Sequence, residues 1–545
     1  MKLKRIFTLG LVGMSLTVMA QTHVEGEEYY KADQFENAKD LLTRSLNNAG
    51  TDKAVSNYYL GLIAVGNDKL ASAEKYFADG VAANPSYAYN YVGQGLLKLK
   101  SGDVKGAEQL FKTAEKNAKK DASLQIAIAR AYDAVDPVAY EKQITKHVAN
   151  ARKYNLENPD IYLFEGDQAK EKKDWGGAAG KYEMAANYDK NATAAYVKYS
   201  SLFTQVNPEY AIKMLKNLLS VNPQSALGQR ELANAFYNKG DYQNAANLYG
   251  TYVKNPSHFK SDESRYAFLL FYGQKFSEGY QYATRLLSED PKNFTAKRYQ
   301  FMNAAQMPEM KEKLPEMAEA LYRAHMQNPK ENKFAAIDFT LIASEFQNNK
   351  EPEKAIKVLE EGIKEMPANA NFHKQMAEVY VDENDLAKSA DAYQEYLKKV
   401  EEPGYNDYVQ QAIYAYYGGA QNIKADPEKS KKYMEMSAKY ARMAREIAPN
   451  QYKPVKILGD ISVAEAPTDE ARKTVATSFY EEAVKLLEAS ADPSRYKSDA
   501  KNLYLYLGNS YIHNDDVATA KVYFKKYLTL DPNNTDVRDY VSKLK

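Results

Sequence analysis

Hydrophobic and polar residues alternate along most of this chain with the period of an amphipathic helix. In the clearest stretch, 502–532, apolar or small residues return every three or four positions on both sides of a polar turn, Asn514-Asp515-Asp516. Residues at these spacings share one helical face. The stretch therefore predicts two amphipathic helices joined by a tight turn. Asp531-Pro532 ends the second helix, because proline cannot continue it.

Small and large side chains follow a fixed order in the same stretch. Gly508 leaves room for two helices to approach, Tyr511 follows at +3, Ala520 at +12, Phe524 at +16 and Tyr527 at +19. The small residues allow close contact of the backbones, and the aromatic rings fill the space between the helices. This ladder closely resembles the tetratricopeptide repeat, a helix–turn–helix unit of about 34 residues.

The ladder recurs in register, and the resemblance covers nearly all of residues 22–545. It implies an all-α solenoid, a superhelix of about fourteen stacked helix pairs with a concave face. Four units fit loosely, and we expect altered curvature at 121–157, 293–329, 403–449 and 451–489. In the first of these units, Asp136-Pro137 is expected to begin a second helix of unusual length. In the third, a tyrosine-rich helix from Tyr405 to Tyr417 is expected to run to Gly418-Gly419.

The expected organisation has three parts. Residues 1–20 form a signal peptide, 21–400 an N-terminal array, and 401–545 a C-terminal array that ends in a capping helix from Thr535. The break between the arrays is expected near Glu401-Glu402-Pro403-Gly404, where the repeat pattern is interrupted. A polar terminal helix is what a solenoid needs to cover its last apolar face.

The first twenty residues predict export. Lys2, Lys4 and Arg5 form a basic start, Ile6 to Met19 an apolar core, and Val18-Met19-Ala20 a small-residue cleavage site before Gln21. The alternative is a membrane anchor, but about 14 apolar-leaning residues are too few to span a bilayer. We therefore expect a periplasmic protein of a Gram-negative cell, peripheral to the outer membrane at most.

Composition narrows the choice of partners. The chain has 73 basic and 72 acidic residues, so nothing predicts binding to nucleic acid or to an anionic membrane. No later stretch is long and apolar enough for a membrane helix. Cysteine is absent, which excludes disulfides, thiolate metal sites and a lipidated N-terminal cysteine.

Catalytic and cofactor motifs were sought and none was found. The six histidines are scattered over different units without metal-ligand spacing. Gly176 to Lys181 hints at a phosphate loop, but it lacks the Ser or Thr after the lysine and falls where a second helix is expected. Acidic clusters such as Asp382 to Asp385 lie on turns, where Asp and Asn cap helices. The sequence predicts no metal, no cofactor and no enzyme.

An apolar groove in the N-terminal repeats is the first candidate for partner binding. Its residues occupy first-helix positions that often face the groove of such arrays, and aromatic side chains there suit an amphipathic helix or an extended peptide. The alternative is that the chain's own packing covers them. The candidate residues are Tyr58, Leu62, Tyr89, Val92 and Leu96.

A second candidate is implied by the family resemblance. One subset of tetratricopeptide proteins holds a C-terminal carboxylate with a clamp of Lys, Asn, Asn, Lys and Arg over three repeats. Arg230 and Asn234 match the first two positions, Arg265 replaces the second Asn, and Asn293 and Lys297 occupy the last two. The alternative is that these are ordinary solvated groove residues.

These observations predict a scaffold that binds a partner protein or peptide, one that belongs to an envelope complex. The alternative from another class is an accessory of glycan or nutrient uptake at the outer membrane. Proteins of that kind also carry such repeats, but usually with a lipidated cysteine and large insertions, which this chain lacks. A third alternative, an enzyme with appended repeats, is disfavoured because no segment outside the repeats is long enough to form a catalytic domain. Degenerate repeats specify shape more than ligand.

Overall fold

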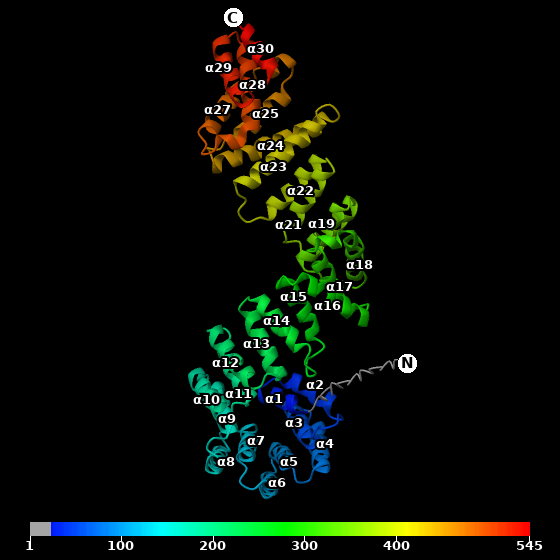
Figure 1. Ribbon diagram of the computed structural model, residues 1–545, viewed down its shortest axis with the longest axis vertical. Helices are drawn as coiled ribbons and strands as arrows, with labels where there is room; N and C mark the ends of the chain where they lie inside the picture. The colour runs from blue at the N-terminus through cyan, green and yellow to red at the C-terminus, as the bar shows by residue number, and fades with distance from the viewer. Residues whose placement is uncertain (1–22, 545) are drawn as a thin grey trace, which may run out of the picture. The chain divides into compact units, whose positions relative to one another are not determined.

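The protein is entirely helical in the part that the computed structural model describes, residues 23–544, which confirms the predicted all-α class. The chain forms two compact units, unit 1 ending at Met307 and unit 2 beginning at Pro308 (Figure 1). The helices of unit 1 are α1 (His23–Lys31), α2 (Phe35–Ser45), α3 (Lys53–Gly66), α4 (Leu70–Ala83), α5 (Tyr89–Lys100), α6 (Val104–Asn117), α7 (Ala122–Asp133), α8 (Glu141–Tyr154), α9 (Pro159–Glu171), α10 (Trp175–Tyr188), α11 (Thr193–Phe203), α12 (Pro208–Val221), α13 (Ala226–Asn238), α14 (Tyr242–Tyr252), α15 (Asp262–Tyr272), α16 (Phe276–Glu289) and α17 (Phe294–Ala304).

Unit 2 continues the alternation of helices and turns after a short 3-10 helix. Its elements are η1 (Pro308–Lys313), α18 (Leu314–Gln327), α19 (Ala336–Asn348), α20 (Pro352–Glu365), α21 (Asn371–Asp382), α22 (Leu386–Lys399), α23 (Tyr405–Asn422), α24 (Pro427–Ile447), α25 (Tyr452–Glu465), α26 (Asp469–Arg472), α27 (Thr477–Glu488), η2 (Pro493–Tyr496), α28 (Lys497–His513), α29 (Val517–Leu530) and α30 (Thr535–Lys543).

Successive helices pack as antiparallel pairs. Unit 1 holds eight such pairs, from α1/α2 to α15/α16, and unit 2 holds five, with the short α26 inserted between α25 and α27. α17 ends unit 1 and α18 follows η1 in unit 2, so these two helices lie on either side of the boundary. The described residues thus contain thirteen such pairs, close to the number of about fourteen that the ladder predicted.

A glycine on the first helix of a pair accommodates an aromatic ring of the second. A Cβ added at Gly61 would come closer than 3.0 Å to the ring of Phe77, and one added at Gly508 would do so at Phe524. Gly93, on the following first helix, faces the same Phe77 ring from the next pair. Phe77 and Phe524 are almost fully buried. The order of small and large residues in the sequence therefore determines how the two helices of such a pair pack together.

Most turns inside the pairs are three residues long, and many end in an aspartate that caps the second helix. Asp103 accepts a hydrogen bond from the N–H of Gly106, and Asp516 accepts one from the N–H of Thr519. The residue before each cap has positive φ, +80° at Gly102 and +59° at Asp515. Gly, Asn and Asp adopt that conformation more readily than other residues, which explains the polar turns.

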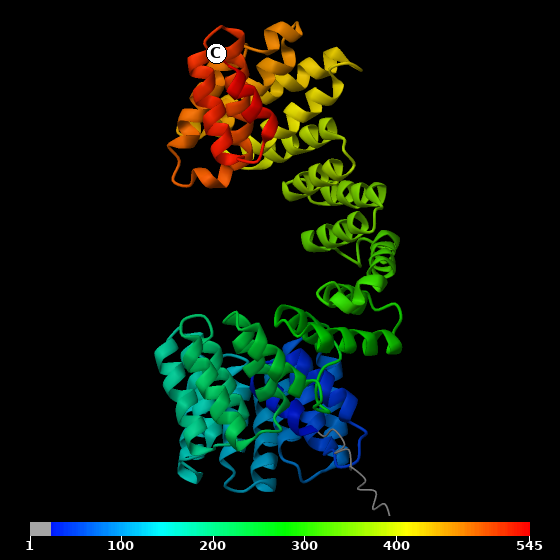
Figure 2. The same cartoon turned by 45° about the horizontal axis from the view of Figure 1, so that its top comes forward.

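Unit 1 closes on itself through its first helix pair. α1 packs against α11 and α13 as well as against its neighbours α2 and α3, and both cartoon views place it beside the green α13 (Figures 1 and 2). The rings of Tyr29 and Phe259 meet edge to face at 5.3 Å. On α2, Arg44 donates to the backbone carbonyls of Ser257 and His258 at 3.0 and 2.9 Å. The first repeat thus contacts repeats about 200 residues later.

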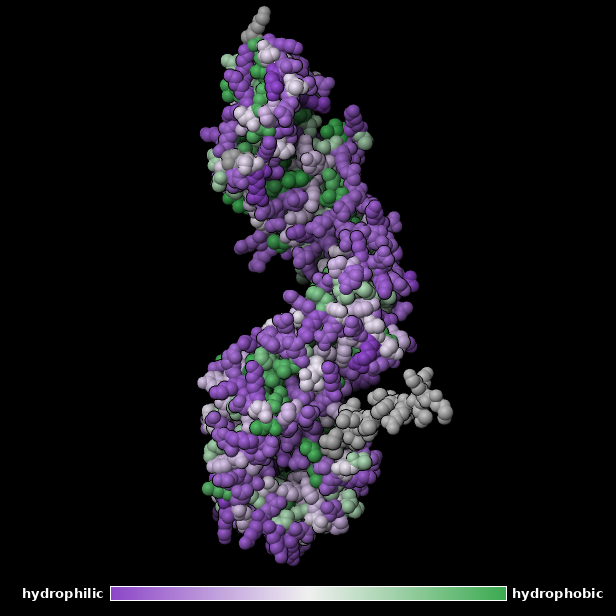
Figure 3. All heavy atoms as spheres, viewed as in Figure 1, coloured by the Kyte–Doolittle hydropathy of each residue, from purple (hydrophilic) through white to green (hydrophobic). Residues whose placement is uncertain are grey.

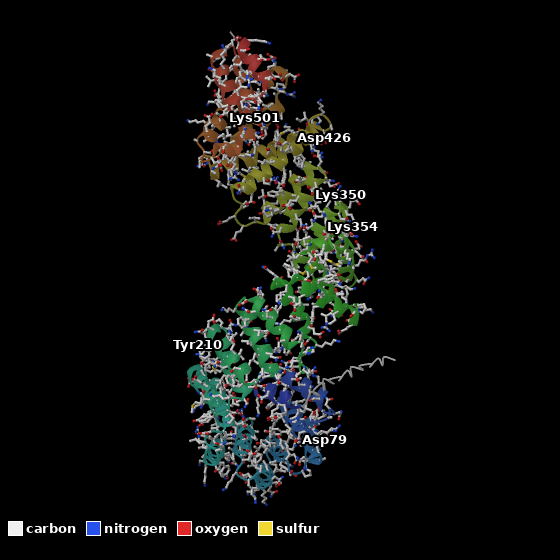
Figure 4. All side chains as sticks on the ribbon, viewed as in Figure 1. Asp79, Tyr210, Lys350, Lys354, Asp426 and Lys501 are labelled. Atoms are coloured by element: carbon white, nitrogen blue, oxygen red, sulfur yellow. The ribbon has the colours of Figure 1, made fainter. Side chains whose placement is uncertain are left out.

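Unit 2 is held by polar caps and ion pairs as well as by its apolar seams. Asp426, labelled in Figure 4, caps α24 by accepting from the N–H of Lys429 at 3.0 Å. Lys501, labelled in the same view, pairs with Asp531 at 2.5 Å and so joins α28 to the end of α29. The predicted capping helix is α30, which buries no residue fully and contacts Phe524 through Tyr540.

Two details of the loose repeats differ from the sequence predictions. The second helix at 121–157 has the ordinary length of 14 residues and begins at Glu141. Asp136 does not start it, because its carboxylate accepts the N–H groups of Val138 and Ala139 and holds a separate turn. The tyrosine-rich helix does not stop at Gly418-Gly419 but continues to Asn422. A Cβ at Gly418 would come within 3.0 Å of the backbone of α22, so these glycines serve helix contact.

The boundary between the two units lies at 307/308, inside the loosely fitting unit 293–329. The predicted division into arrays at 400/401 stays a prediction. Across that point, α22 packs directly against α23 within unit 2. The signal peptide predicted at 1–20 lies outside the described residues.

Candidate functional site

The residues of the predicted aromatic groove are buried or half-buried in the structure. Tyr58, Val92 and Leu96 are buried, whereas Leu62 and Tyr89 are half-buried. The rings of Tyr58 and Tyr89 pack edge to face, 5.5 Å apart. Burial raises the pKa of both tyrosines above the usual range, so their hydroxyls stay protonated at neutral pH. This arrangement matches the alternative considered for these residues, and a partner-binding role for them remains untested.

Arg230, the first clamp position, is already occupied by groups of the chain itself. Its guanidinium donates to Asp262 at 2.7 Å and to the Gln34 side chain at 3.3 Å. It also lies 5.6 Å from the centre of the Phe259 ring. Burial alone would lower the pKa of Arg230, but the hydrogen bond and the charge of Asp262 raise it. A carboxylate ligand would therefore have to displace Asp262.

The other clamp residues have different surroundings. Asn234 is half-buried, and its side-chain oxygen is buried without a hydrogen-bond partner among the described residues. Arg265 is exposed and stacks on Tyr237 at 5.0 Å, and Lys297 is half-buried. Asn293 caps α17 by accepting from the N–H of Ala296. Within residues 23–544, no hydrogen bond or ion pair joins any two of Arg230, Asn234, Arg265 and Lys297.

Two glutamates of α1 lie at the N-termini of distant helices. Glu25 accepts hydrogen bonds from the N–H groups of Ala226 and Leu227 in the first turn of α13, at 3.0 and 3.4 Å. Glu28 lies near the N–H of Ala194 in the first turn of α11, which favours its charged form. Helix N-termini carry partial positive charge and unpaired N–H groups, so carboxylates are favourable there. Burial nevertheless raises the pKa of Glu25, and it raises that of Glu28 to about 7.

A charge network joins the turn after α1 to α9 and α11. Lys198, whose side chain is 4% exposed, lies 2.7 Å from both Asp33 and Asp167. Asp167 also pairs with Arg130 at 2.8 Å and accepts the hydroxyl of Tyr182. Burial pushes the pKa of Asp167 up, but Arg130 and Lys198 hold it below the usual value. These charges are paired with one another, so they stabilise the closure of unit 1 and are not free to hold a ligand.

An open cleft lies where the second helix of the irregular repeat separates from the next first helix. It has a volume of about 640 Å³ and lies between α8 and α9, with the loop before α8 at its mouth. Apolar side chains form its floor and charged ones its rim. The lining includes Val138, Ile144, Thr145, Val148, Ala149, Arg152, Glu165, Gln168 and Lys172.

Sequence reasoning did not single out these cleft residues. A signal was present, because the linker 134–140 has seven residues where most pairs have three, and the repeat pattern blurs there. In the sequence that irregularity predicts only altered curvature, and the candidate site residues fall on first-helix positions of other repeats. In the structure the long linker instead coincides with a hollow that the regular repeats fill.

Unit 2 contains a smaller hollow of about 380 Å³ beside the start of α24. Its apolar lining comes from Ile423, Met434, Ala464 and Ala466. Elsewhere the visible face of each unit is mostly hydrophilic, with hydrophobic residues in small separate groups (Figure 3). The α8–α9 cleft is thus the larger of the two hollows and the better candidate for a partner site.

Among the described residues, no group of three or more His, Asp or Glu side chains is arranged to hold a metal ion. No helix in the same part of the chain has the length and apolarity needed to cross a bilayer.

Comparison with known families gives a direct match. The family model described as tetratricopeptide repeat matches residues 58–122 and 200–257, which include most of α3–α6 and α12–α14. The chain contains tetratricopeptide repeats. A comparison with curated proteins finds no match.

Similar solved structures include other arrays of these repeats. The C-terminal part of a TPR repeat-containing protein from Cytophaga hutchinsonii shares 14% identity, over 51% of this chain and 98% of that one, with a TM-score of 0.40. Yeast Tom70 shares 12% identity, over 96% and 98% of the two chains, with a TM-score of 0.28. Tetratricopeptide repeats generally serve protein–protein interaction, and no enzyme family is indicated for this chain.

Proposed function

We propose that this chain is a non-catalytic scaffold of the cell envelope that binds partner proteins through its tetratricopeptide repeats. The observation that carries the proposal is the family match to these repeats, whose exposed helix faces are suited to protein contact. An open cleft between two helices of unit 1 supplies a preformed surface for such contact. A largely preorganised surface loses little binding free energy to ordering of the scaffold.

The proposed location is the periplasm. It rests on the basic, apolar and small-residue segments of residues 1–20 and on the absence of cysteine. An exported chain without thiols needs no oxidative folding steps. A partner would then be another envelope protein or a segment of one.

The binding surface is proposed to lie outside the predicted groove and clamp. Tyr58 and Tyr89 are held in the packing of unit 1, and Arg230 is paired with Asp262. A ligand at either place would have to displace contacts of the chain itself. The α8–α9 cleft requires no such displacement.

Fractionation of native cells and cross-linked affinity purification test the proposal together. The protein is expected in the periplasmic fraction with an N-terminus at or near Gln21, and one or more envelope proteins should copurify in stoichiometric amount. Cytoplasmic protein that retains residues 1–20 would contradict the location. A purified chain that carries no partner after cross-linking in cells would contradict the scaffold role.

A further inference from the structure

The α8–α9 cleft lies beside the linker before α8, which is the longest linker inside a helix pair of unit 1. Asp136 accepts the N–H groups of Val138 and Ala139, at 3.0 and 2.9 Å, and fixes this linker as a turn that projects beyond α7. α8 then packs along α7 but contacts α9 at few points, as α6 does α7, whereas α10 packs along α11. Between α8 and α9 this leaves an open cleft.

The floor of the cleft is apolar, and one apolar side chain stands at its mouth. Ile144 is buried beneath it, and Val148 is half-buried. Val138 is 84% exposed, the highest value among the large hydrophobic residues of the described chain. An exposed apolar side chain beside an apolar floor gains free energy when a second apolar surface covers both.

The rim carries more acidic than basic groups. Its carboxylates are Asp133, Glu141, Glu165 and Glu171, and its cations are Arg152 and Lys172. Arg152 is already paired with Glu165, which also binds Lys181 at 2.8 Å. Glu141 and Glu171 are exposed and form no ion pair within the described part of the chain. The groups that remain available to a partner are therefore mainly negative.

The backbone around the cleft selects the conformation of a partner. The elements on both sides are helices, whose N–H and C=O groups are bonded internally, so no strand edge is present there for an extended peptide to pair with. A helical segment satisfies its own backbone groups and presents only side chains. The volume of about 640 Å³ lies in the range of sites that bind small ligands or anchor side chains.

We infer that the α8–α9 cleft binds an amphipathic helical segment of a partner protein, with apolar residues at i, i+3 or i+4, and i+7 and with Lys or Arg at its edges. The apolar residues lie over Val138, Ile144 and Val148, and the cations face Glu141 and Glu171. This inference rests on the scaffold role proposed above, and it names the class of segment that the scaffold holds.

A peptide library displayed on phage tests the inference with the full chain as bait. Random 16-residue peptides are selected and then measured as synthetic peptides by fluorescence anisotropy. The selected peptides are expected to combine helical apolar spacing with at least two basic residues. Acidic consensus peptides, or basic peptides without the apolar spacing, would overturn the inference.

Two variants locate the binding. Val138→Asp should weaken the selected peptides at least tenfold, whereas Val206→Asp, at another exposed valine of unit 1, should not. Glu141→Lys combined with Glu171→Lys should weaken them at least tenfold and should restore binding of peptides whose basic residues are changed to Glu. The matched control reverses Glu74 and Asp79, two exposed acidic residues of α4, the second of which is labelled in Figure 4.

Three other outcomes would also overturn the inference, and one of them leaves the scaffold proposal intact. Peptides bound equally by all variants would place the site elsewhere and overturn the inference. The inference would also be overturned if sedimentation showed that two copies of this chain associate through the cleft and that Val138→Asp abolishes this association. If cross-linking in cells still captures an envelope partner with Val138→Asp, the inference fails while the scaffold proposal stands. Circular dichroism confirms that each variant is folded before any comparison.

Discussion

The carboxylate of Glu25 accepts the backbone N–H of Ala226 at 3.0 Å, although 201 residues separate the two along the chain. The bond places an acidic side chain of the first helix at the N-terminus of α13. Glu28 lies near the start of α11, and Arg44 reaches the loop before α15. These contacts bring the first repeat against repeats about 200 residues later.

Glu28→Gln is expected to change how stability depends on pH. The folded protein holds the Glu28 proton more tightly than the unfolded chain, with a pKa of about 7 against an ordinary 4.5. Unfolding therefore releases a proton between these values, and the stability that this group contributes is lost as pH rises from about 4.5 to 7. Between pH 5 and pH 7.5, the unfolding free energy of the variant should fall by roughly 1–3 kcal/mol less than that of the unchanged protein, as measured by urea unfolding. Glu74→Gln is the control, and equal pH slopes for the two proteins would contradict the prediction.

The contribution of His147 to stability should depend on pH in the opposite direction. The His147 side chain is buried against α7, with Nδ1 2.7 Å from Gln125 Oε1, and burial lowers the pKa of His147 from 6.5 to about 4. Unfolding then takes up a proton, so the contribution of this group to stability is lost as pH falls from about 6.5 to 4. The imidazole resonance, assigned with His147→Gln, is expected to titrate well below pH 6 by NMR. A midpoint near 6.5 would show that the ring is accessible to water.

Gly61→Ala should destabilise unit 1 by about 1–3 kcal/mol, because the added methyl group meets the buried ring of Phe77. Gly66→Ala is the matched control in the same helix. A Cβ there meets nothing within 4 Å, and alanine should stabilise the helix by up to about 1 kcal/mol. The two variants are compared by urea unfolding. Similar effects would mean that the ring of Phe77 moves aside without cost.

Arg230→Ala should loosen the closure of unit 1. It removes the pair with Asp262 and the hydrogen bond to Gln34, and it leaves a buried carboxylate without its partner, at an expected cost of about 3 kcal/mol. Hydrogen exchange should rise in α1 and α13 but stay unchanged in unit 2. Arg265→Ala, an exposed arginine two helices later, provides the control. Unchanged protection of α1 would show that the closure does not depend on this arginine.

Tyr58→Ala combined with Tyr89→Ala should lower stability before it tests binding. Tyr58 is 5% exposed and packs against several other tyrosines. Loss of a buried aromatic ring costs about 3–5 kcal/mol. Tyr210→Ala, at a tyrosine with 51% exposure labelled in Figure 4, should cost far less. Partner binding lost by the double variant while the unfolding free energy is unchanged would instead support the predicted groove.

The repeat pattern was sufficient to predict the local architecture. Gly61 with Phe77 and Gly508 with Phe524 are spaced 16 residues apart in the chain, and each pair meets in the structure as the ladder implied. Such contacts lie within one helix pair, so they depend only on local spacing. The polar turns follow for the same reason, as the cap at Asp516 shows.

The site could not be predicted in the same way. Whether Glu25 meets Ala226 depends on the accumulated rotation of all the intervening pairs, and no local pattern encodes that sum. Arg230 therefore resembled an open clamp position when only its own repeat was considered. Gly418 and Gly419 were likewise misread as the end of a helix, since the approach of α22 to Gly418 and of α24 to Gly419 has no signature beside them in the sequence.

The closure of unit 1 also sets an order of events during synthesis. In an open solenoid each repeat gains its stability from its immediate neighbours, so the first pair can fold as soon as the second emerges. Here α1 completes its contacts only after α13 and Phe259 have been made, about 200 residues later. Such long-range contacts slow folding because a large loop must close first. The N-terminal helix pair should therefore remain incompletely protected from hydrogen exchange while the chain is being made. Unit 1 should then fold cooperatively as a whole, and not repeat by repeat from its N-terminus.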